Sequence, residues 1–128
     1  MAEFLVVPPE PAEWSLGVEA FAEAVVARWP DAGVRGWGEG AHLAASAWIR
    51  GSEPWDDILV ELHPNGRTIG IDVRSYERAA EIACWWRRLV PPDIAVLWLF
   101  DRSFPGYSEL WPDTTPSEIF AGSGAQEH

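Results

Sequence analysis

Three stretches in the middle of the chain alternate apolar and polar side chains, which is the period of a strand with one buried face. They are Leu43–Ile49, Ile58–Leu62 and Ile69–Val73. Between the last two stretches, Pro64-Asn65-Gly66 is a strong hairpin signal. Placing the apolar side chains of both strands on one face pairs Leu62 with Ile69 and leaves a four-residue loop. The pattern therefore predicts an antiparallel hairpin with a defined register.

Two longer stretches carry apolar side chains at helical spacing, which predicts two amphipathic helices. The first follows Ser15, a good N-cap residue, and ends at Pro30. The second follows Ser75 and ends at Pro91. The apolar stripe of the first helix comprises Val18, Phe21, Ala22, Val25 and Trp29, and that of the second comprises Ala79, Ile82, Ala83, Trp86 and Leu89.

Two apolar runs without alternation predict further strands. Phe4–Val7 is short and ends at a pair of prolines. Ile94–Phe100 is continuous, as is typical of a strand covered on both faces, so we expect it at the centre of the sheet with Trp29, Ile82 and Trp86 buried against it. Residues 31–40 contain four glycines and are expected to form a loop or an irregular edge. The tail is expected to be irregular up to Thr115.

Thr115-Pro116-Ser117-Glu118 has the pattern of a capping box and predicts a short last helix. The predicted order is therefore β-α-β-β-β-α-β-α. This order predicts an α+β fold, with a single mixed or mostly antiparallel sheet and the two main helices on one face. We expect residues 1–122 to form a single domain and residues 123–128 to be a loose C-terminal tail. The face of the three alternating strands away from the helices is polar with apolar members: Ser46, Trp48, Arg50, Asp57, Leu59, Glu61, Thr68 and Asp72.

The charge of the chain is strongly unbalanced. Of its 128 residues, twenty are acidic and nine are basic, all nine being arginine, so the net charge is −11. Such a field repels nucleic acid and anionic lipid and attracts cationic surfaces, although solubility alone also explains it. Nine tryptophans are many for this length. Tryptophan often anchors protein interfaces, but we expect most of the nine in the core or at its edge.

Several features favour the cytoplasm. No apolar run approaches the roughly 20 residues that span a bilayer, and Met1-Ala2-Glu3 does not begin a signal-peptide pattern. Cys84 is the single cysteine, so no internal disulfide can form. We expect a cytoplasmic protein that binds neither membrane nor nucleic acid.

The sequence offers no defensible catalytic or metal site. His42, His63 and His128 are scattered without ligand spacing, and His63 is expected to be an exposed turn residue. The glycine-rich segment 36–40 lacks the Gly-Lys-Ser/Thr ending of a phosphate loop. We therefore expect a protein that is not an enzyme and needs no cofactor. The main alternative is a small ligand-binding domain or an enzyme whose site is assembled only in three dimensions.

Acidic and aromatic side chains occur together in two places, Glu53–Asp57 and Asp101–Asp113. Paired acids could bind a divalent cation or act as acid and base, and a solvated turn with Asp57 paired to Arg74 is the simpler alternative. Contact with a protein partner is the function we favour for this combination. The candidate partner-binding residues are Glu53, Trp55, Asp56, Trp85, Asp101, Tyr107 and Trp111. A solvated loop is an alternative for each of them.

Two short motifs carry a resemblance. Ala27-Arg28-Trp29-Pro30 and Pro112-Asp113-Thr114-Thr115 resemble a pattern in small acidic uncharacterised α+β proteins of high-GC bacteria. In size, charge, tryptophan content and lack of an active site the chain is also similar to immunity proteins of bacterial toxin systems. The resemblance implies a non-catalytic intracellular binding module that neutralises a basic toxin, and it supplies no site residues. A housekeeping regulator or scaffold of the same charge is the alternative within the binding class.

Overall fold

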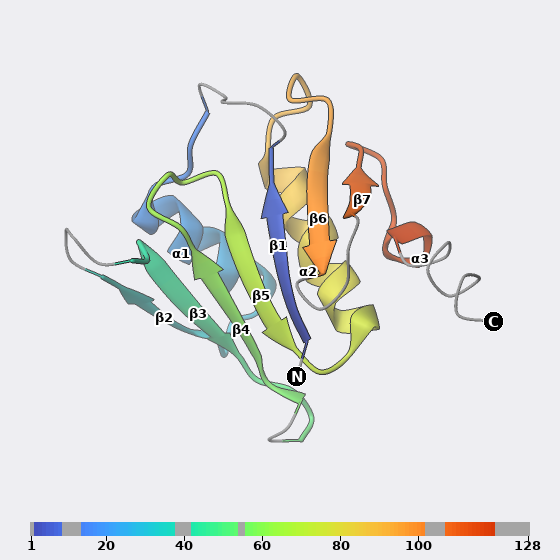
Figure 1. Ribbon diagram of the computed structural model, residues 1–128. Helices are drawn as coiled ribbons and strands as arrows, with labels where there is room; N and C mark the ends of the chain where they lie inside the picture. The colour runs from blue at the N-terminus through green and yellow to red at the C-terminus, as the bar shows by residue number, and fades with distance from the viewer. Residues whose placement is uncertain (1, 9–13, 38–41, 54–55, 102–106, 120–128) are drawn as a thin grey trace.

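Seven strands of the described residues form one sheet, and the described pairings are antiparallel (Figure 1). The computed structural model describes residues 2–8, 14–37, 42–53, 56–101 and 107–119. The strands are β1 (Ala2–Val7), β2 (Gly33–Gly36), β3 (Ala45–Ile49), β4 (Ile58–Leu62), β5 (Ile69–Val73), β6 (Leu97–Asp101) and β7 (Tyr107–Leu110). The helices are α1 (Val18–Arg28), α2 (Tyr76–Leu89) and the short α3 (Pro116–Ile119). Across the sheet the strand order is β2-β3-β4-β5-β1-β6-β7.

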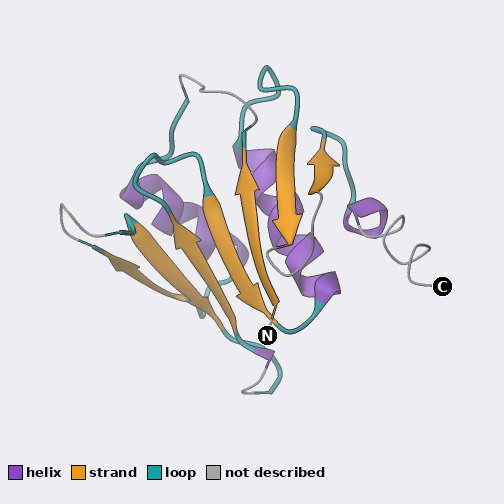
Figure 2. Cartoon of the chain, viewed as in Figure 1, coloured by secondary structure: helices purple, strands orange, loops and turns teal. Residues whose placement is uncertain are grey.

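The main helices lie on one side of the sheet. Figure 2 shows α1 and α2 behind the strands and α3 beside β7. The Oγ atom of Ser108 in β7 donates a hydrogen bond to the carbonyl oxygen of Ile119 at 3.4 Å, which ties α3 to this edge. The predicted α+β class is therefore confirmed, with an antiparallel sheet. Among the described residues, no helix has the length and apolar character needed to cross a membrane.

The hairpin between β4 and β5 has the predicted register, with Leu62 opposite Ile69. Its loop is held by Asn65, whose Oδ1 atom accepts hydrogen bonds from the backbone nitrogens of Arg67 and Thr68 at 2.8 and 3.1 Å. Gly66 follows with a φ of 69°, a conformation that residues with a Cβ atom rarely adopt. The predicted ion pair of Asp57 does not form, because the Asp57 carboxylate accepts hydrogen bonds from Trp48 and Gly51 instead.

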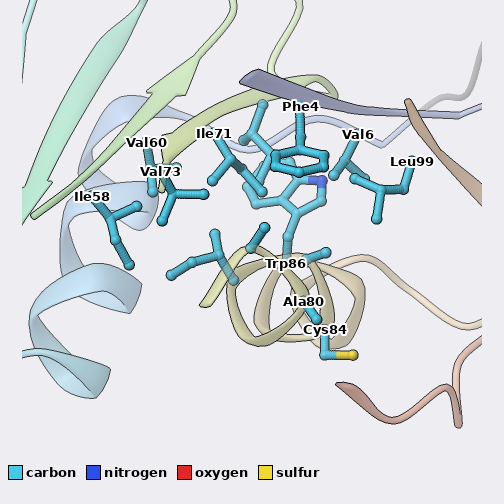
Figure 3. Packing of buried hydrophobic residues seen from close by; sticks show 14 of the residues in the cluster. Phe4, Val6, Ile58, Val60, Ile71, Val73, Ala80, Cys84, Trp86 and Leu99 are labelled. Atoms are coloured by element: carbon cyan, nitrogen blue, oxygen red, sulfur yellow. The ribbon is translucent and has the colours of Figure 1, made fainter. Parts of the chain in front are cut away.

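Burial alternates along the strands, and the buried side chains face the helices. In α2, Ser75 caps the first turn as predicted, accepting a hydrogen bond from the backbone nitrogen of Arg78 at 3.4 Å. Trp86 of the same helix has no exposed surface and points toward Phe4 and Val6 of β1 (Figure 3). Helix α1 begins later than predicted, at Val18, with Gly17 as its N-cap and without a side-chain cap.

The strand β6 does not lie at the centre of the sheet, so that prediction was wrong. The central strand is β5, with β1 beside it, and β6 is next to the edge strand β7. Of the residues expected to be buried, Ile82 and Trp86 are buried, but Trp29 is only half-buried. The apolar run of β6 has another cause, because Trp98 and Phe100 contact Tyr107 on the face opposite the helices. An aromatic cluster on an exposed face has thus the same sequence signature as a doubly covered strand.

Two edge strands were missed by the sequence analysis. β2 lies in the segment predicted as a loop, and β7 lies in the tail that was expected to be irregular. Each has four residues, and each pairs with one described strand. Edge strands this short carry little periodicity and depend on their neighbour for hydrogen bonds. The predicted loose tail, residues 123–128, lies outside the described residues.

Candidate functional site

The face of the sheet opposite α1 and α2 is covered by no described helix (Figure 2). We call it the open face. Strand register decides which side chains it carries, because alternate residues share a face. From β2 to β7 they include Arg35, Ser46, Trp48, Leu59, Glu61, His63, Gly70, Asp72, Glu3, Leu5, Val7, Trp98, Phe100, Tyr107 and Glu109. Large aromatic rings and carboxylates on one continuous surface make it the strongest candidate for contact with another molecule.

An aromatic cluster of Trp98, Phe100 and Tyr107 occupies the β6–β7 side of the open face. The ring of Tyr107 lies 4.9 Å from that of Trp98 and 5.8 Å from that of Phe100, centroid to centroid. Tyr107 is 53% exposed, while the other two are half-buried. Rings that support one another in this way present a rigid apolar surface with little conformational entropy to lose on binding.

Two exposed tryptophans, Trp37 and Trp48, lie toward the β2–β3 side. Trp48 is 50% exposed, and its Nε1 atom donates to Oδ2 of Asp57 at 3.0 Å. The other oxygen of the Asp57 carboxylate accepts from the backbone nitrogen of Gly51 at 2.9 Å. Trp37 donates to Oγ of Ser46 at 3.3 Å. These hydrogen bonds fix the orientation of indole rings that solvent reaches.

Carboxylates separate the two aromatic regions. Glu61 of β4 lies opposite Gly70, and Asp72 of β5 lies opposite Leu59. The Oδ1 atom of Asp72 is buried and has no hydrogen-bond partner among the described residues. Four strand spacings separate Trp48 on β3 from Phe100 on β6, a span of about 20 Å. The open face therefore combines aromatic patches at its two sides with negative charge between them.

His63 lies on the open face and is half-buried, not the exposed turn residue that was expected. A Cβ atom at Gly70 would lie 3.7 Å from both Nε2 of His63 and Oε1 of Glu61, so the two side chains approach the same point. No hydrogen bond joins them. Within the described residues, no three His, Cys, Asp or Glu side chains are grouped so as to hold a metal ion.

The first acidic group predicted from the sequence lies in the turn between β3 and β4. Glu53 is exposed there. Asp56 is half-buried and accepts a hydrogen bond from Oγ of Ser52 at 3.2 Å, while its carbonyl oxygen accepts from Nη1 of Arg78 at 2.8 Å. Trp55 lies outside the described residues. The described contacts of Asp56 hold the turn against α2.

Two further candidates serve packing between elements. Trp85 is half-buried between α1 and α2, with its ring 5.1 Å from that of Trp29 and 6.3 Å from that of Phe21. Asp101, at the end of β6, accepts a hydrogen bond from the hydroxyl of Tyr76 at 2.8 Å. Both lie on the helix side of the sheet, away from the open face.

The seven candidates are therefore not brought together on one surface. Tyr107 belongs to the open face, and Trp111 is exposed just after β7. The sequence analysis missed Trp98 and Phe100 as surface residues, because it placed their strand at the centre of the sheet. It did place Trp48, Glu61 and Asp72 on a half-open face, but it did not select them as partner-binding residues.

Among the described residues, a hollow on the helix side with a volume of about 330 Å³ is a candidate for the alternative of a ligand-binding site. It is lined by Arg28, Glu81, Cys84, Trp85, Arg88, Leu89 and Pro116. Arg28 and Arg88 stand in the last turns of their helices, where cations offset the helix dipole without any ligand. Cys84 is buried and donates to the carbonyl oxygen of Thr114 at 3.4 Å. Arg28, Cys84 and Arg88 thus have roles in the fold that require no ligand.

Comparison with protein-family models, with curated proteins and with solved structures found no match to this chain. Its function is accordingly argued from its own residues.

Proposed function

We propose that this protein is a non-catalytic binding module whose open face docks onto a basic protein. The observation that carries the proposal is the arrangement of an exposed, hydrogen-bonded tryptophan and a cluster of aromatic rings around carboxylates on a sheet face that no described helix covers. Interface hot spots are enriched in tryptophan and tyrosine surrounded by polar residues. This pairing of anchors with negative charge is the chemistry that a cationic protein surface requires.

The aromatic groups supply affinity in this proposal. Exposed apolar area of this kind favours association because burial removes it from water. Tyr107 and Trp48 bring large rings whose positions are already fixed, so ordering them on binding costs little. The span of about 20 Å between the two aromatic regions suits a protein surface of standard interface size.

In this proposal the negative charge of the chain raises the association rate and selects cationic partners. A net charge of −11 accelerates encounter with a cationic partner and disfavours nucleic acid. Glu61 and Asp72 place part of this charge on the open face itself. A basic partner would neutralise these carboxylates while it covers the aromatic rings.

The narrower form of the proposal is an inhibitor that neutralises a basic bacterial toxin. Its support is the resemblance to immunity proteins together with the acidic open face. A toxin that acts on nucleic acid needs a positively charged cleft, and an acidic sheet face would compete for that cleft. If the neighbouring gene in the native genome encodes a basic protein whose toxicity this chain abolishes, the narrower form is supported.

The general proposal is tested with charge-matched variants. Proteins captured from lysate of the native cells by the immobilised chain are identified, and each is purified for affinity measurements. Glu61→Gln/Asp72→Asn removes two negative charges from the open face, and Glu23→Gln/Glu81→Gln removes two from exposed positions on α1 and α2. We expect the first pair to weaken binding of a basic partner about tenfold or more and the second by less than about threefold.

Equal losses from the two pairs would show that only net charge matters and would exclude the open face as the docking surface. Capture of acidic or neutral proteins alone, with no basic protein that binds when purified, would refute the proposal. Urea unfolding of each variant verifies that the fold is intact.

A further inference from the structure

On the basis of the proposed function, we further propose that Trp48 and Asp57 form a subsite for an arginine side chain of the basic partner. Trp48 stands on β3 with half of its surface exposed. Within the described residues, no aromatic ring and no cation contacts the Trp48 indole. By contrast, the exposed ring of Tyr107 contacts Trp98, and that of Trp37 contacts Arg35. The ring is a large binding surface that the described chain leaves open.

The hydrogen bond of the Trp48 indole determines which part of the ring a partner can contact. Its Nε1–H group is already donated to Oδ2 of Asp57 at 3.0 Å, so the ring presents its π faces to a partner. The face of an indole carries negative potential and attracts cations. The same bond holds the ring in one orientation, which makes the subsite pre-formed.

Asp57 adds a charge beside that ring. Its two oxygens accept from neutral donors, Trp48 Nε1 and the backbone nitrogen of Gly51. Within the described residues no arginine or histidine comes within ion-pair distance of it. A cation stacked on the indole would therefore find a carboxylate within reach at the ring edge.

The open face already contains one intramolecular contact of the kind proposed for Trp48. The guanidinium carbon of Arg35 lies 4.2 Å from the centroid of the Trp37 ring, one strand away from Trp48. The indole nitrogen of Trp37 is likewise donated to a neighbour, Ser46. Trp37 is thus a hydrogen-bonded tryptophan with a guanidinium already in place. Trp48 has the same arrangement, with the cation position open to a partner.

Arginine fits this subsite better than lysine. Its guanidinium is planar, stacks on an aromatic face and keeps N–H donors in the plane of the group for a carboxylate at the edge. Lysine can supply the charge but cannot stack and donate in the same geometry.

The test uses two short peptides of equal length and charge, tetra-arginine and tetra-lysine, titrated into the full chain. Indole N–H resonances are followed by two-dimensional NMR, and the Trp48 resonance is the one lost in Trp48→Phe. We expect tetra-arginine to shift the Trp48 resonance saturably and to bind about two- to fivefold tighter than tetra-lysine. Trp48→Ala should remove this preference.

Trp37→Ala is the matched control. It deletes an exposed tryptophan of the same face whose ring Arg35 already occupies. The preference for tetra-arginine should survive in this variant. Asp57→Asn should weaken arginine binding, whereas Glu81→Gln, an equal change of charge on the helix side, should not.

Equal affinity for the two peptides, or a preference that persists in Trp48→Ala, would overturn the subsite. Shifts confined to the Trp98 indole, in the aromatic cluster, would also overturn it, while leaving the open face as the docking surface. The proposed function fails by a different result, the charge-matched affinities with a purified partner, so the two failures are distinguishable.

Discussion

At the residue scale, the tryptophans of this chain differ most in how much of each ring solvent reaches. Trp86 has no exposed surface and packs against β1, whereas Trp48 is half exposed on the opposite face of the sheet. Both were placed correctly by periodicity, since Trp86 belongs to a helical apolar stripe and Trp48 to the polar side of an alternating strand. Replacing the two tryptophans should therefore change the unfolding free energy by different amounts.

Trp86→Ala is therefore expected to cost about 3–5 kcal/mol of unfolding free energy, because it leaves a large cavity in the core. Trp48→Ala removes a half-exposed ring and its hydrogen bond to Asp57, and should cost less, about 0.5–1.5 kcal/mol. Urea denaturation followed by circular dichroism compares the two. A large loss in Trp48→Ala would mean that the ring is needed for folding, and binding data from that variant would then lose their meaning.

Cys84 links stability to pH. Burial raises the pKa of the Cys84 thiol above its ordinary value, and this outweighs the lowering effect of Arg88. The folded state thus favours the neutral thiol, so its contribution is fully present below the ordinary thiol pKa and is lost as pH rises through the folded value.

We expect the unfolding free energy to fall as pH rises above about 8.5, the ordinary thiol pKa, and Cys84→Ala to reduce that fall. Urea denaturation at several pH values measures both slopes. An identical slope in the variant would contradict the role assigned to Cys84.

At the element scale, the strongest local signals predicted their elements, whereas the order of the strands in the sheet was not predicted. The β4–β5 hairpin was predictable because its loop and its register lie within one short stretch of sequence. The places of β1 and β6 in the sheet were not, because β1 pairs with strands about seventy and a hundred residues away. The aromatic cluster was missed for a different reason: β7 has only four residues and was not recognised as a strand, so the pairing that brings Tyr107 beside Trp98 and Phe100 was not predicted. The candidate site was thus predictable on β3 to β5 and unpredictable on β6 and β7.

Gly66 tests the hairpin turn. It combines a φ of 69° with a Cβ position 2.8 Å from the carbonyl oxygen of Leu16, so a side chain is strained and crowded. Gly66→Ala should cost at least about 1–2 kcal/mol. Gly33→Ala in β2 is the control, because nothing lies within 4 Å of its Cβ position. Thermal unfolding should separate the two variants, and equal melting temperatures would argue against the turn geometry.

At the scale of the whole molecule, the helices and the charge give the sheet two different faces. α1 and α2 bury one face, and the other carries aromatic rings and carboxylates (Figure 2). A net charge of −11 acts over a distance set by the ionic strength, while the aromatic rings act only on contact. Rate and residence time of a complex should therefore respond to different residues.

We expect the association rate with a basic partner to fall about tenfold or more between low and physiological ionic strength. Tyr107→Ala should instead raise the dissociation rate, by about thirtyfold if the ring is a hot spot worth about 2 kcal/mol. Surface plasmon resonance at two salt concentrations separates these effects. An association rate that does not change with salt concentration would show that electrostatic attraction does not accelerate binding.

Mapping which residues become covered in the complex tests the proposed docking surface most directly. Hydrogen exchange at backbone amides and tryptophan indoles would be recorded for the free chain and for the chain saturated with its purified basic partner. We expect added protection at the Trp48 indole and along β3, β6 and β7, with little change on the outer sides of α1 and α2. Protection concentrated on α1 and α2, with the open face unchanged, would contradict the proposal.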